Sequence, residues 1–385
     1  MSLHSPAIVG IGELPPRRSS PGVTTLGMIT RAARDAAQDA EIAPSDIDGL
    51  VVGVQVGETP QHVAVTVAEF LGLQPSFAEV VDLGGASGAG MIWRADAAIR
   101  AGMCTTVLCV LGNSRDPEQQ PRATNRNPIR EFDVPVGASG ANTSYALIAQ
   151  RYLHEYGRTA ADLALVPVVE RANAQLNPAA VFHDEPLTVE DVLGSPVVSD
   201  PLHLLEIVMP CAGGAAVIVT DGGRSSPGPH RPIRLRGAGE LVTHRAVSAA
   251  PTLTSSPLRA AMTRAIRQAG VQSSDLQLLS LYDCYSILVL ITLEDLGVCA
   301  PGQAADWIRD HDVSHTGSTA LNTHGGQLAC GQADLAGGMG HVIEAVRQLR
   351  GDAGPRQMSD VELALVTGNG ATMGEEVALV LEAGP

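Results

Sequence analysis

The chain lacks lysine entirely: among its 385 residues all 25 basic ones are arginine. A Schiff-base mechanism needs a lysine amine, so the sequence excludes that route of carbonyl chemistry. A phosphate loop of the Walker type is excluded for the same reason. The 41 acidic residues give a formal net charge of -16, so the basic footprint expected of a nucleic-acid-binding protein is missing.

Paired cysteines and long apolar runs are missing as well. The six cysteines, at positions 104, 109, 211, 284, 299 and 330, form no CxxC pair. They predict reduced thiols in a cytoplasmic protein rather than a disulfide framework or a zinc site. No run of about 18 uncharged apolar residues predicts a membrane span. The N-terminal stretch MSLHSPAIVGIGELPP lacks the basic and apolar regions of a secretory signal.

A weak internal repeat is present. Residues 40–52 read AEIAPSDIDGLVV and residues 269–281 read AGVQSSDLQLLSL. Residues 107–114, VLCVLGNS, match residues 363–370, LALVTGNG, in the same order. These continuous apolar runs are typical of strands in a sheet that is covered on both faces. The two matches in register predict two similar α/β halves.

The repeat predicts three regions. An N-terminal half spans residues 1–115, a loop and helical insertion spans 116–230, and a C-terminal half spans 231–385. The insertion begins with a polar, Pro- and Arg-rich stretch, 113–132, that is typical of a loop. Helical stretches around 145–156 and 160–174 follow, and a strand before residue 222 is expected to return to the first half.

Two tyrosines follow the apolar strand of the second half. The chain holds five tyrosines, and Tyr282 and Tyr285 lie in the segment LYDCYS, between that strand and a helical run. The C-terminal end of a strand is where α/β proteins place their sites, so Tyr282 is a candidate catalytic residue. A boundary tyrosine whose hydroxyl reaches water is the structural alternative. Asp283 is expected to be a helix cap or a hydrogen-bond acceptor rather than a base.

Two glycine-rich segments carry the remaining candidates. The turn over residues 81–91 precedes a helix, whose N-terminus favours negative charge, although close packing is an equally good explanation. In the second segment, LNTHGGQLACGQ, His324 is a candidate acid, base or hydrogen-bond donor, or a structural histidine. Gln332 can exchange hydrogen bonds but no protons. Nothing beside Cys330 predicts a lowered thiol pKa.

These segments, in this order, resemble the thiolase superfamily over essentially the whole chain. The resemblance is strongest to sterol-carrier-protein-type thiolases and to lipid-transfer-protein-type aldolases of bacterial steroid side-chain degradation. It is carried by the stretches DVLGSPVVSDPLHLLEIVMPCAGGAAV, YDCYSILVLITLEDLGVC and LNTHGGQLACGQADLAGGMGHVIEAVRQLRG. It implies a thiolase fold, with two α/β halves packed as a layered α-β-α-β-α core and an inserted loop region.

The resemblance also implies which thiolase groups are gone. The nucleophilic cysteine of the C-[SA]-S-G turn falls on Gly85, and the G-H-P histidine falls on Gln332. The acid–base cysteine of the C-x-G motif falls on Val366. A working thiolase is therefore not expected. The glycine-rich turns remain, and main-chain groups at Gly85, Gly368 and Gly370 are the expected oxyanion site.

A site that keeps an enolate but drops acyl transfer suits retro-aldol cleavage of a β-hydroxyacyl-CoA, for instance a steroid side-chain thioester. Tyr282 is the expected base, and Tyr285, His324 or a water held by Gln332 is the expected acid. The only cofactor expected is the CoA of the substrate. The resemblance implies a homodimer flanked by a small acyl-CoA-binding partner with an OB fold and a zinc ribbon, the zinc lying in the partner.

Two other functions stay open at this point. The chain is a non-catalytic subunit of an acyl-CoA-processing complex if its thiolase fold serves only to dock another enzyme. It is an acyltransferase if Cys284 or Cys330 replaces the lost nucleophile.

Overall fold

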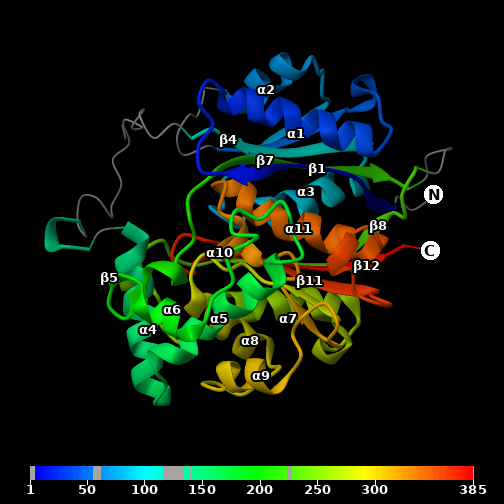
Figure 1. The fold of residues 1–385 in the computed structure, drawn as a ribbon. Helices are drawn as coiled ribbons and strands as arrows, with labels where there is room; N and C mark the ends of the chain where they lie inside the picture. The colour runs from blue at the N-terminus through cyan, green and yellow to red at the C-terminus, as the bar shows by residue number, and fades with distance from the viewer. Residues whose placement is uncertain (1–4, 55–61, 116–133, 139, 223–227, 385) are drawn as a thin grey trace.

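The computed structural model describes residues 5–54, 62–115, 134–138, 140–222 and 228–384. Within them, ten strands form one large mixed sheet, and two short strands, β5 (Val197–Ser199) and β6 (Leu202–His203), form a separate pair. The large sheet consists of an N-terminal and a C-terminal half, which lie one above the other in Figure 1. They join where β1 pairs with β8, through Ala7 opposite Arg234 and Ile8 opposite Ile233.

The two halves have the same strand pattern. The N-terminal half runs β3 (Phe77–Val81), β2 (Gly49–Gly53), β4 (Thr106–Asn113), β7 (Ala212–Asp221) and β1 (Pro6–Arg17). The C-terminal half runs β10 (Ala320–Leu321), β9 (Leu278–Ser280), β11 (Leu363–Gly370), β12 (Glu375–Ala383) and β8 (Ile233–Val242). In each half the first three strands are parallel, and the last two join antiparallel. The internal repeat predicted from the sequence is thus a repeat of the fold.

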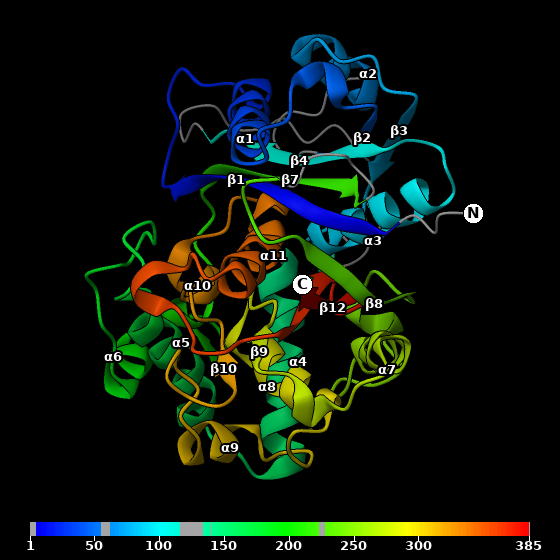
Figure 2. The ribbon, with the colours of Figure 1, turned by 90° about the vertical axis from the view of Figure 1, so that its right-hand side faces the viewer.

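Helices form three layers around the two half-sheets, as Figures 1 and 2 show from two sides. The outer layer of the N-terminal half holds α1 (Thr25–Asp39) and α2 (Val63–Leu71), and the middle layer holds α3 (Ser87–Arg100) and α11 (Leu335–Arg350). The outer layer of the C-terminal half holds α7 (Leu258–Ala269) and α8 (Ser286–Leu296), with α9 (Ala304–Asp310) packed on α8. The short helix α10 (Gly326–Cys330) packs on α5 (Ala160–Ala174) of the insertion. The layered α-β-α-β-α architecture is confirmed.

Strand β4 illustrates why the predicted strands are apolar along their whole length. Cys109 and Leu111 pack in the central core with the middle helices, whereas Leu108 and Val110 pack in the outer core under α1 and α2. Successive side chains of a strand point to opposite faces, so a sheet covered on both faces needs apolar residues at every position.

Glycines bring the outer helices close to each half-sheet. A Cβ atom on Gly10 or Gly12 of β1 would overlap main-chain atoms of α1, and a Cβ on Gly237 or Gly239 of β8 would overlap those of α7. Glycine in a strand often marks such a close approach. Glycines occur at the matching strands β1 and β8, so the two halves also share the way in which the outer helix packs on the sheet.

The insertion packs against the C-terminal half (Figure 1). It contains α4 (Gly140–Tyr156), α5 (Ala160–Ala174) and α6 (Val189–Gly194), which confirms both predicted helical stretches. It ends in β7, which returns to the first half between β1 and β4 as predicted. The stretch 113–132 lies mostly outside the described residues, and the division at residues 115 and 230 stays a prediction. In the described part of the chain, no helix has the length and apolarity needed to cross a membrane.

Candidate active site

Tyr282 lies just beyond β9, at the C-terminal end of the strand where the sequence predicts a site. Its main-chain N–H donates a hydrogen bond to Thr367 Oγ1 at 2.9 Å, which ties it to the neighbouring strand β11. The side chain is buried, with 3% of its surface exposed. Tyr282 therefore points into the protein, which contradicts the alternative of a boundary tyrosine in water.

The hydroxyl of Tyr282 occupies the space that a side chain at position 85 would need. A Cβ atom built on Gly85 would overlap the Tyr282 hydroxyl oxygen and would lie 2.6 Å from the main-chain oxygen of Asn369. Real Cβ atoms essentially never come closer than 3.0 Å to such neighbours. The glycine therefore does more than remove a nucleophile, because it leaves room for a phenol.

Gln332 holds the same hydroxyl. Its Nε2 atom donates a hydrogen bond to the Tyr282 oxygen at 2.9 Å. The main chain of Gln332 is fixed by two hydrogen bonds to the segment before β7, from its own N–H to Met209 O at 2.8 Å and from Cys211 N–H to its carbonyl at 2.7 Å. The returning segment of the insertion thus positions the amide over the tyrosine.

The surroundings set the protonation of Tyr282. Burial raises the pKa of its hydroxyl well above the usual range, and the nearby Cys284 and Asp283 act in the same direction. The amide of Gln332 opposes them, because a donor to the oxygen stabilises the phenolate. The resting tyrosine is neutral, and Gln332 is placed to lower the free energy of its ionised form.

Asp283 is part of a buried polar cluster behind Tyr282. It accepts hydrogen bonds from His341 Nε2 and from Leu328 N–H, both at 2.9 Å. Burial alone would raise the pKa of Asp283, but these donors hold it below its usual value. Burial and the charge of Asp283 raise the pKa of Glu170 well above its usual range, so Glu170 is a neutral acid. Asp283 is the structural acceptor that the sequence predicts.

Tyr285 faces the insertion. It occupies the N-cap position of α8 without a side-chain capping bond, and its hydroxyl donates to Asn142 Oδ1 of α4 at 2.6 Å. Its ring stacks on Tyr145 of the same helix, with centroids 4.1 Å apart and an angle of 17°. Asn369 Nδ2 in turn donates to the Tyr145 hydroxyl at 2.8 Å. In this structure Tyr285 holds α4 against the site.

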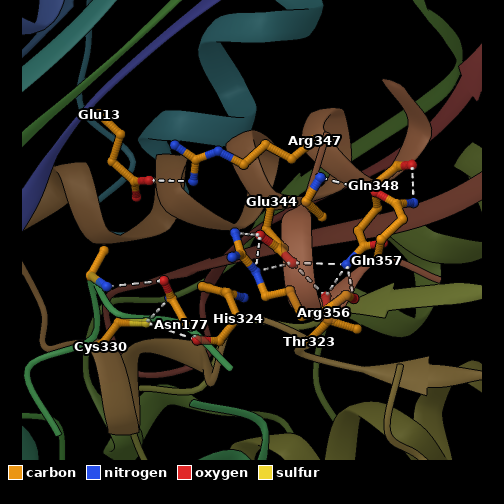
Figure 3. Close-up of polar contacts among 12 residues, drawn as sticks. Glu13, Asn177, Thr323, His324, Cys330, Glu344, Arg347, Gln348, Arg356 and Gln357 are labelled. Atoms are coloured by element: carbon orange, nitrogen blue, oxygen red, sulfur yellow. Dashed lines mark hydrogen bonds and ion pairs between the residues drawn. The ribbon is translucent and has the colours of Figure 1, made fainter. Parts of the chain in front are cut away.

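His324 lies in the loop after β10, beside the polar network drawn in Figure 3. Its main-chain carbonyl accepts hydrogen bonds from Asn177 Nδ2 at 3.0 Å and from the Cys330 thiol at 3.2 Å. Burial, together with His341, lowers the pKa of His324 to about 3, so its imidazole is neutral. Its ring lies edge-on to His341, with centroids 5.1 Å apart.

The network in Figure 3 surrounds Thr323, the residue before His324 in that loop. Arg356 forms an ion pair with Glu344, with Nη2 2.8 Å from Oε2, and both side chains are buried. Glu344 also accepts from Thr323 Oγ1 at 2.6 Å and from Gln348 Nε2 at 3.1 Å. Thr323 precedes His324, so the ion pair determines where the loop lies.

The two glycine-rich turns pack main chain against main chain. A Cβ on Gly368 would lie 2.8 Å from Ala86 Cα, and one on Gly370 would overlap the carbonyl of Leu83. The oxyanion role of Gly85, Gly368 and Gly370 stays a prediction. Four residues near these loops, Asn322, Asp334, Ala371 and Met373, have positive φ angles without being glycine. Such backbone strain is typical of functional sites.

The remaining thiols are poor nucleophiles. Burial raises the pKa of both Cys284 and Cys330 well above the usual range, so neither carries the thiolate that acyl transfer needs. Among the described residues no group of three or more His, Cys, Asp or Glu side chains is arranged to hold a metal ion.

Sequence reasoning missed Asn369, Thr367, Tyr145 and Glu170, which complete the surroundings of Tyr282. Asn369 and Thr367 lie in the stretch that matches its counterpart in the first half, so the repeat marks their strand but not their side chains. Tyr145 and Glu170 reach the site from the insertion, and no local pattern marks them.

Comparison with known proteins decides the family. A family model described as "Thiolase C-terminal domain-like" matches residues 239–383. The "17-hydroxy-3-oxo-4-pregnene-20-carboxyl-CoA lyase" of Mycobacterium tuberculosis is 32% identical over 375 residues, which cover 94% of this chain and 95% of that protein. A "Steroid side-chain-cleaving aldolase" of Thermomonospora curvata is 33% identical, and the match covers 94% of each chain. The chain belongs to the thiolase superfamily, in its branch of thiolase-like aldolases.

A solved structure supports this membership of the thiolase-like aldolases. The "Ltp2-ChsH2(DUF35) aldolase" superposes with a TM-score of 0.89 at 32% sequence identity and covers 98% of both chains. The thiolase fold implied by the sequence is thereby confirmed. The match of Gly85 to the nucleophile position of a thiolase stays a prediction of the sequence resemblance.

Proposed function

We propose that the protein is a carbon–carbon lyase that cleaves a β-hydroxyacyl-CoA, with a steroid side-chain thioester as its substrate class. The observation that carries the proposal is the Tyr282 hydroxyl in the space beside Gly85, held by Gln332. A phenol has taken the place of a thiol, so the site offers proton transfer where acyl transfer would need a nucleophile. The activities by which the two relatives are named support the same reaction class.

The reaction balances without a metal or a redox partner. The reaction starts from the minor ionised form of Tyr282, whose proton has passed to solvent. Its phenolate takes the proton of the β-hydroxyl group, and the electron pair of the O–H bond forms a carbonyl. The bond between the α and β carbons breaks, and its electrons delocalise into the thioester as an enolate. A proton then adds to the α carbon, which yields a ketone or aldehyde and a shorter acyl-CoA.

Tyr282 is proposed as both base and acid. Gln332 carries no transferable proton, the hydroxyl of Tyr285 is bonded to Asn142, and the imidazole of His324 is neutral. The β-hydroxyl oxygen and the α carbon are attached to the same carbon atom, so one phenol can face both. Tyr282 then returns the proton that it has taken. Tyr285 and His324 as the acid stay predictions, which Tyr285→Phe and His324→Gln test.

In this proposal the only cofactor is the CoA that forms part of the substrate. The protein forms a homodimer, and it binds a small partner protein with an OB fold and a zinc ribbon. The solved relative, the "Ltp2-ChsH2(DUF35) aldolase", pairs Ltp2 with a DUF35 protein and supports an assembly with such a partner. The scattered, unpaired cysteines support a reducing compartment, the cytoplasm.

A non-catalytic docking subunit is the second candidate. One observation favours it: Gln332, which contacts the Tyr282 hydroxyl, cannot transfer a proton. The two candidates differ in whether removing one oxygen atom, that of Tyr282, changes turnover.

The deciding experiment mixes the purified chain with β-hydroxyacyl-CoA thioesters of steroid and simpler acids, with and without a DUF35-type partner. Mass spectrometry follows the ketone or aldehyde and the acyl-CoA. Tyr156→Phe, a half-buried tyrosine of α4, is the matched control. Cleavage that is lost in Tyr282→Phe and kept in Tyr156→Phe would establish the lyase. No cleavage of any substrate, even with the partner, would favour the docking subunit.

A further inference from the structure

Glu376 is a buried carboxyl group without a partner. It lies on β12, has no exposed surface, and neither of its side-chain oxygens forms a hydrogen bond with any described residue. Its cross-strand neighbour on β11 is Asn369, and the Oδ1 atom of Asn369 also lacks a partner. Two unpartnered acceptors thus lie side by side in the core, which is an unusual arrangement because buried polar groups nearly always find a hydrogen bond.

No cation compensates Glu376 among the described residues. The charged groups that act on it are Asp295 of α8 and the adjacent Glu375, both acidic. Asp295 is itself occupied by Arg259, Ser255 and Ser256. From the other elements packed around it come Leu241 of β8, the neutral phenol of Tyr145 and the neutral thiol of Cys284. An ionised carboxylate in such surroundings would be very costly.

Protonation of the Glu376 carboxyl group removes the cost of burying its charge. Burial, with the charges of Asp295 and Glu375, raises the pKa of Glu376 well above its usual range. Directly opposite residues of an antiparallel pair have Cβ atoms about 4.5–5.5 Å apart, so a protonated carboxyl group reaches the Asn369 side chain. We propose that Glu376 is a neutral acid that donates a hydrogen bond to Asn369 Oδ1 and so positions Asn369 in the active site.

The orientation of the Asn369 amide gives this hydrogen bond its importance. Nδ2 of Asn369 faces Tyr145 and donates to its hydroxyl at 2.8 Å, so Oδ1 is the atom left for a donor from Glu376. An ionised Glu376 would instead attract Nδ2 and turn Oδ1 towards Tyr145. The Tyr145 hydroxyl would then have to donate to Oδ1 and lose its hydrogen bond to Cys284. The neutral acid fits the orientation observed, because it supplies the donor that Oδ1 lacks among the described residues.

Asn369 connects this bond to the site. Its main-chain oxygen borders the space beside Gly85 where the Tyr282 hydroxyl lies. Its side chain donates a hydrogen bond to Tyr145, which stacks on Tyr285. This stacking keeps α4 against the segment between β9 and α8 that contains Tyr282. Glu376 is therefore a positioning residue. Its effect on turnover rests on the proposed function, whereas its protonation does not.

The first test measures thermal unfolding of the full chain against pH, for the wild type and Glu376→Gln. A native group with a raised pKa binds a proton that the unfolded chain releases, so its stabilisation is lost as the pH rises towards the folded pKa. We expect the Tm of the wild type to fall relative to Glu376→Gln between about pH 6 and about pH 9. Glu375→Gln, on the adjacent and less buried residue, is the control, and its own pH-dependent difference should be smaller.

The second test uses the infrared carbonyl stretch of protonated carboxyl groups. We expect the wild type to show this band at neutral pH, with one part lost in Glu376→Gln and another in Glu170→Gln. The absence of any change in Glu376→Gln would overturn the proposal, as would a Tm difference between the wild type and Glu376→Gln that does not change with pH. Both results would mean that Glu376 binds no extra proton in the folded chain.

Kinetics test the positioning role. Glu376→Gln keeps a donor for Asn369 Oδ1, and we expect its kcat to stay within about twofold of the wild type, since a neutral hydrogen bond of similar shape is retained. Glu376→Leu leaves Oδ1 unpaired, and we expect kcat to fall about tenfold. Equal kcat values in the two variants would overturn the positioning role. If the wild type shows no lyase activity, the stability and infrared results still decide the protonation of Glu376.

Discussion

The two halves of the sheet share their strand order and their glycine-backed outer helices, yet they contribute unequally to the site. The C-terminal half supplies the side chains, because Tyr282 follows β9, and Thr367 and Asn369 lie at the end of β11. The N-terminal half supplies a turn without side chains at Gly84 and Gly85. The repeated fold thus sets the backbone positions in both halves. The candidate site lies where Gly85 of the N-terminal half leaves a space that the Tyr282 hydroxyl of the C-terminal half fills.

The halves also differ in how they stabilise their loops. The core under α1 and α2 consists of apolar side chains, many of them alanine. The C-terminal half instead buries the ion pair between Arg356 and Glu344 and the hydrogen bonds around it. A buried polar group that loses its partner is costly, so we expect a single substitution in this half to lower the free energy of unfolding more.

Removing the hydroxyl of Tyr282 tests the contribution of the C-terminal half most directly. We expect Tyr282→Phe to lower kcat about 10³-fold, because general acid–base groups contribute on this scale. The phenyl ring keeps the packing, so the Tm should change little. Steady-state kinetics and circular dichroism measure the two. A variant that keeps full turnover would remove Tyr282 from the mechanism.

Breaking the buried ion pair tests the difference in stability. Arg356→Leu leaves Glu344 buried without its counter-ion, and we expect a loss of about 3–5 kcal/mol in the free energy of unfolding. Urea titration measures it. The control is Arg151→Leu, which removes the exposed partner of Glu155 and should cost less than about 1 kcal/mol. Equal losses would contradict the special role of the buried pair.

Filling the space of the N-terminal half tests the complementarity of the two halves. Gly85→Ala places a methyl group where the Tyr282 hydroxyl lies, and we expect kcat to fall about 10²-fold from the displacement of the phenol. Gly85→Cys should lose lyase activity in the same way without gaining acyl transfer. Gly340→Ala is the control, because its Cβ would meet one atom within 4 Å, Glu13 Oε1 at 3.5 Å. Full activity in Gly85→Ala would refute the shared space.

Removing the amide of Gln332 has the smallest expected effect. Gln332 lowers the pKa of Tyr282, so Gln332→Leu raises it and depletes the phenolate at any pH below that pKa. We expect about a tenfold loss of kcat/KM at neutral pH, the effect of one pKa unit. The rising limb of the pH–rate profile should move to higher pH. A profile that keeps its position would show that the amide does not tune the phenol.

Much of the frame was predictable from the sequence. The repeated stretches fold alike, each as a short 3₁₀ turn followed by a strand, Pro44–Asp46 before β2 and Ser273–Asp275 before β9. Patterns of this kind are local, so the sequence carries them directly. The place of Tyr282 at the end of β9 was predictable for the same reason.

The contacts that make the site were not predictable. Gln332 meets Tyr282 across 50 residues, and Asn369 meets Tyr145 across 224. Such distant pairs depend on how the layers pack, which no local pattern records. Glu376 lies in the stretch GEEVALV, where two adjacent acidic residues resemble the exposed start of a strand. Its burial follows only from the position of β12 inside the sheet.

The shared space beside Gly85 also couples two distant positions of the chain. A Cβ atom at position 85 would overlap the Tyr282 hydroxyl, so a side chain at position 85 and the phenol of Tyr282 fit together only if the phenol moves. The residue types at these two positions therefore cannot be varied independently, and the effects of substitutions at positions 85 and 282 are expected to be non-additive.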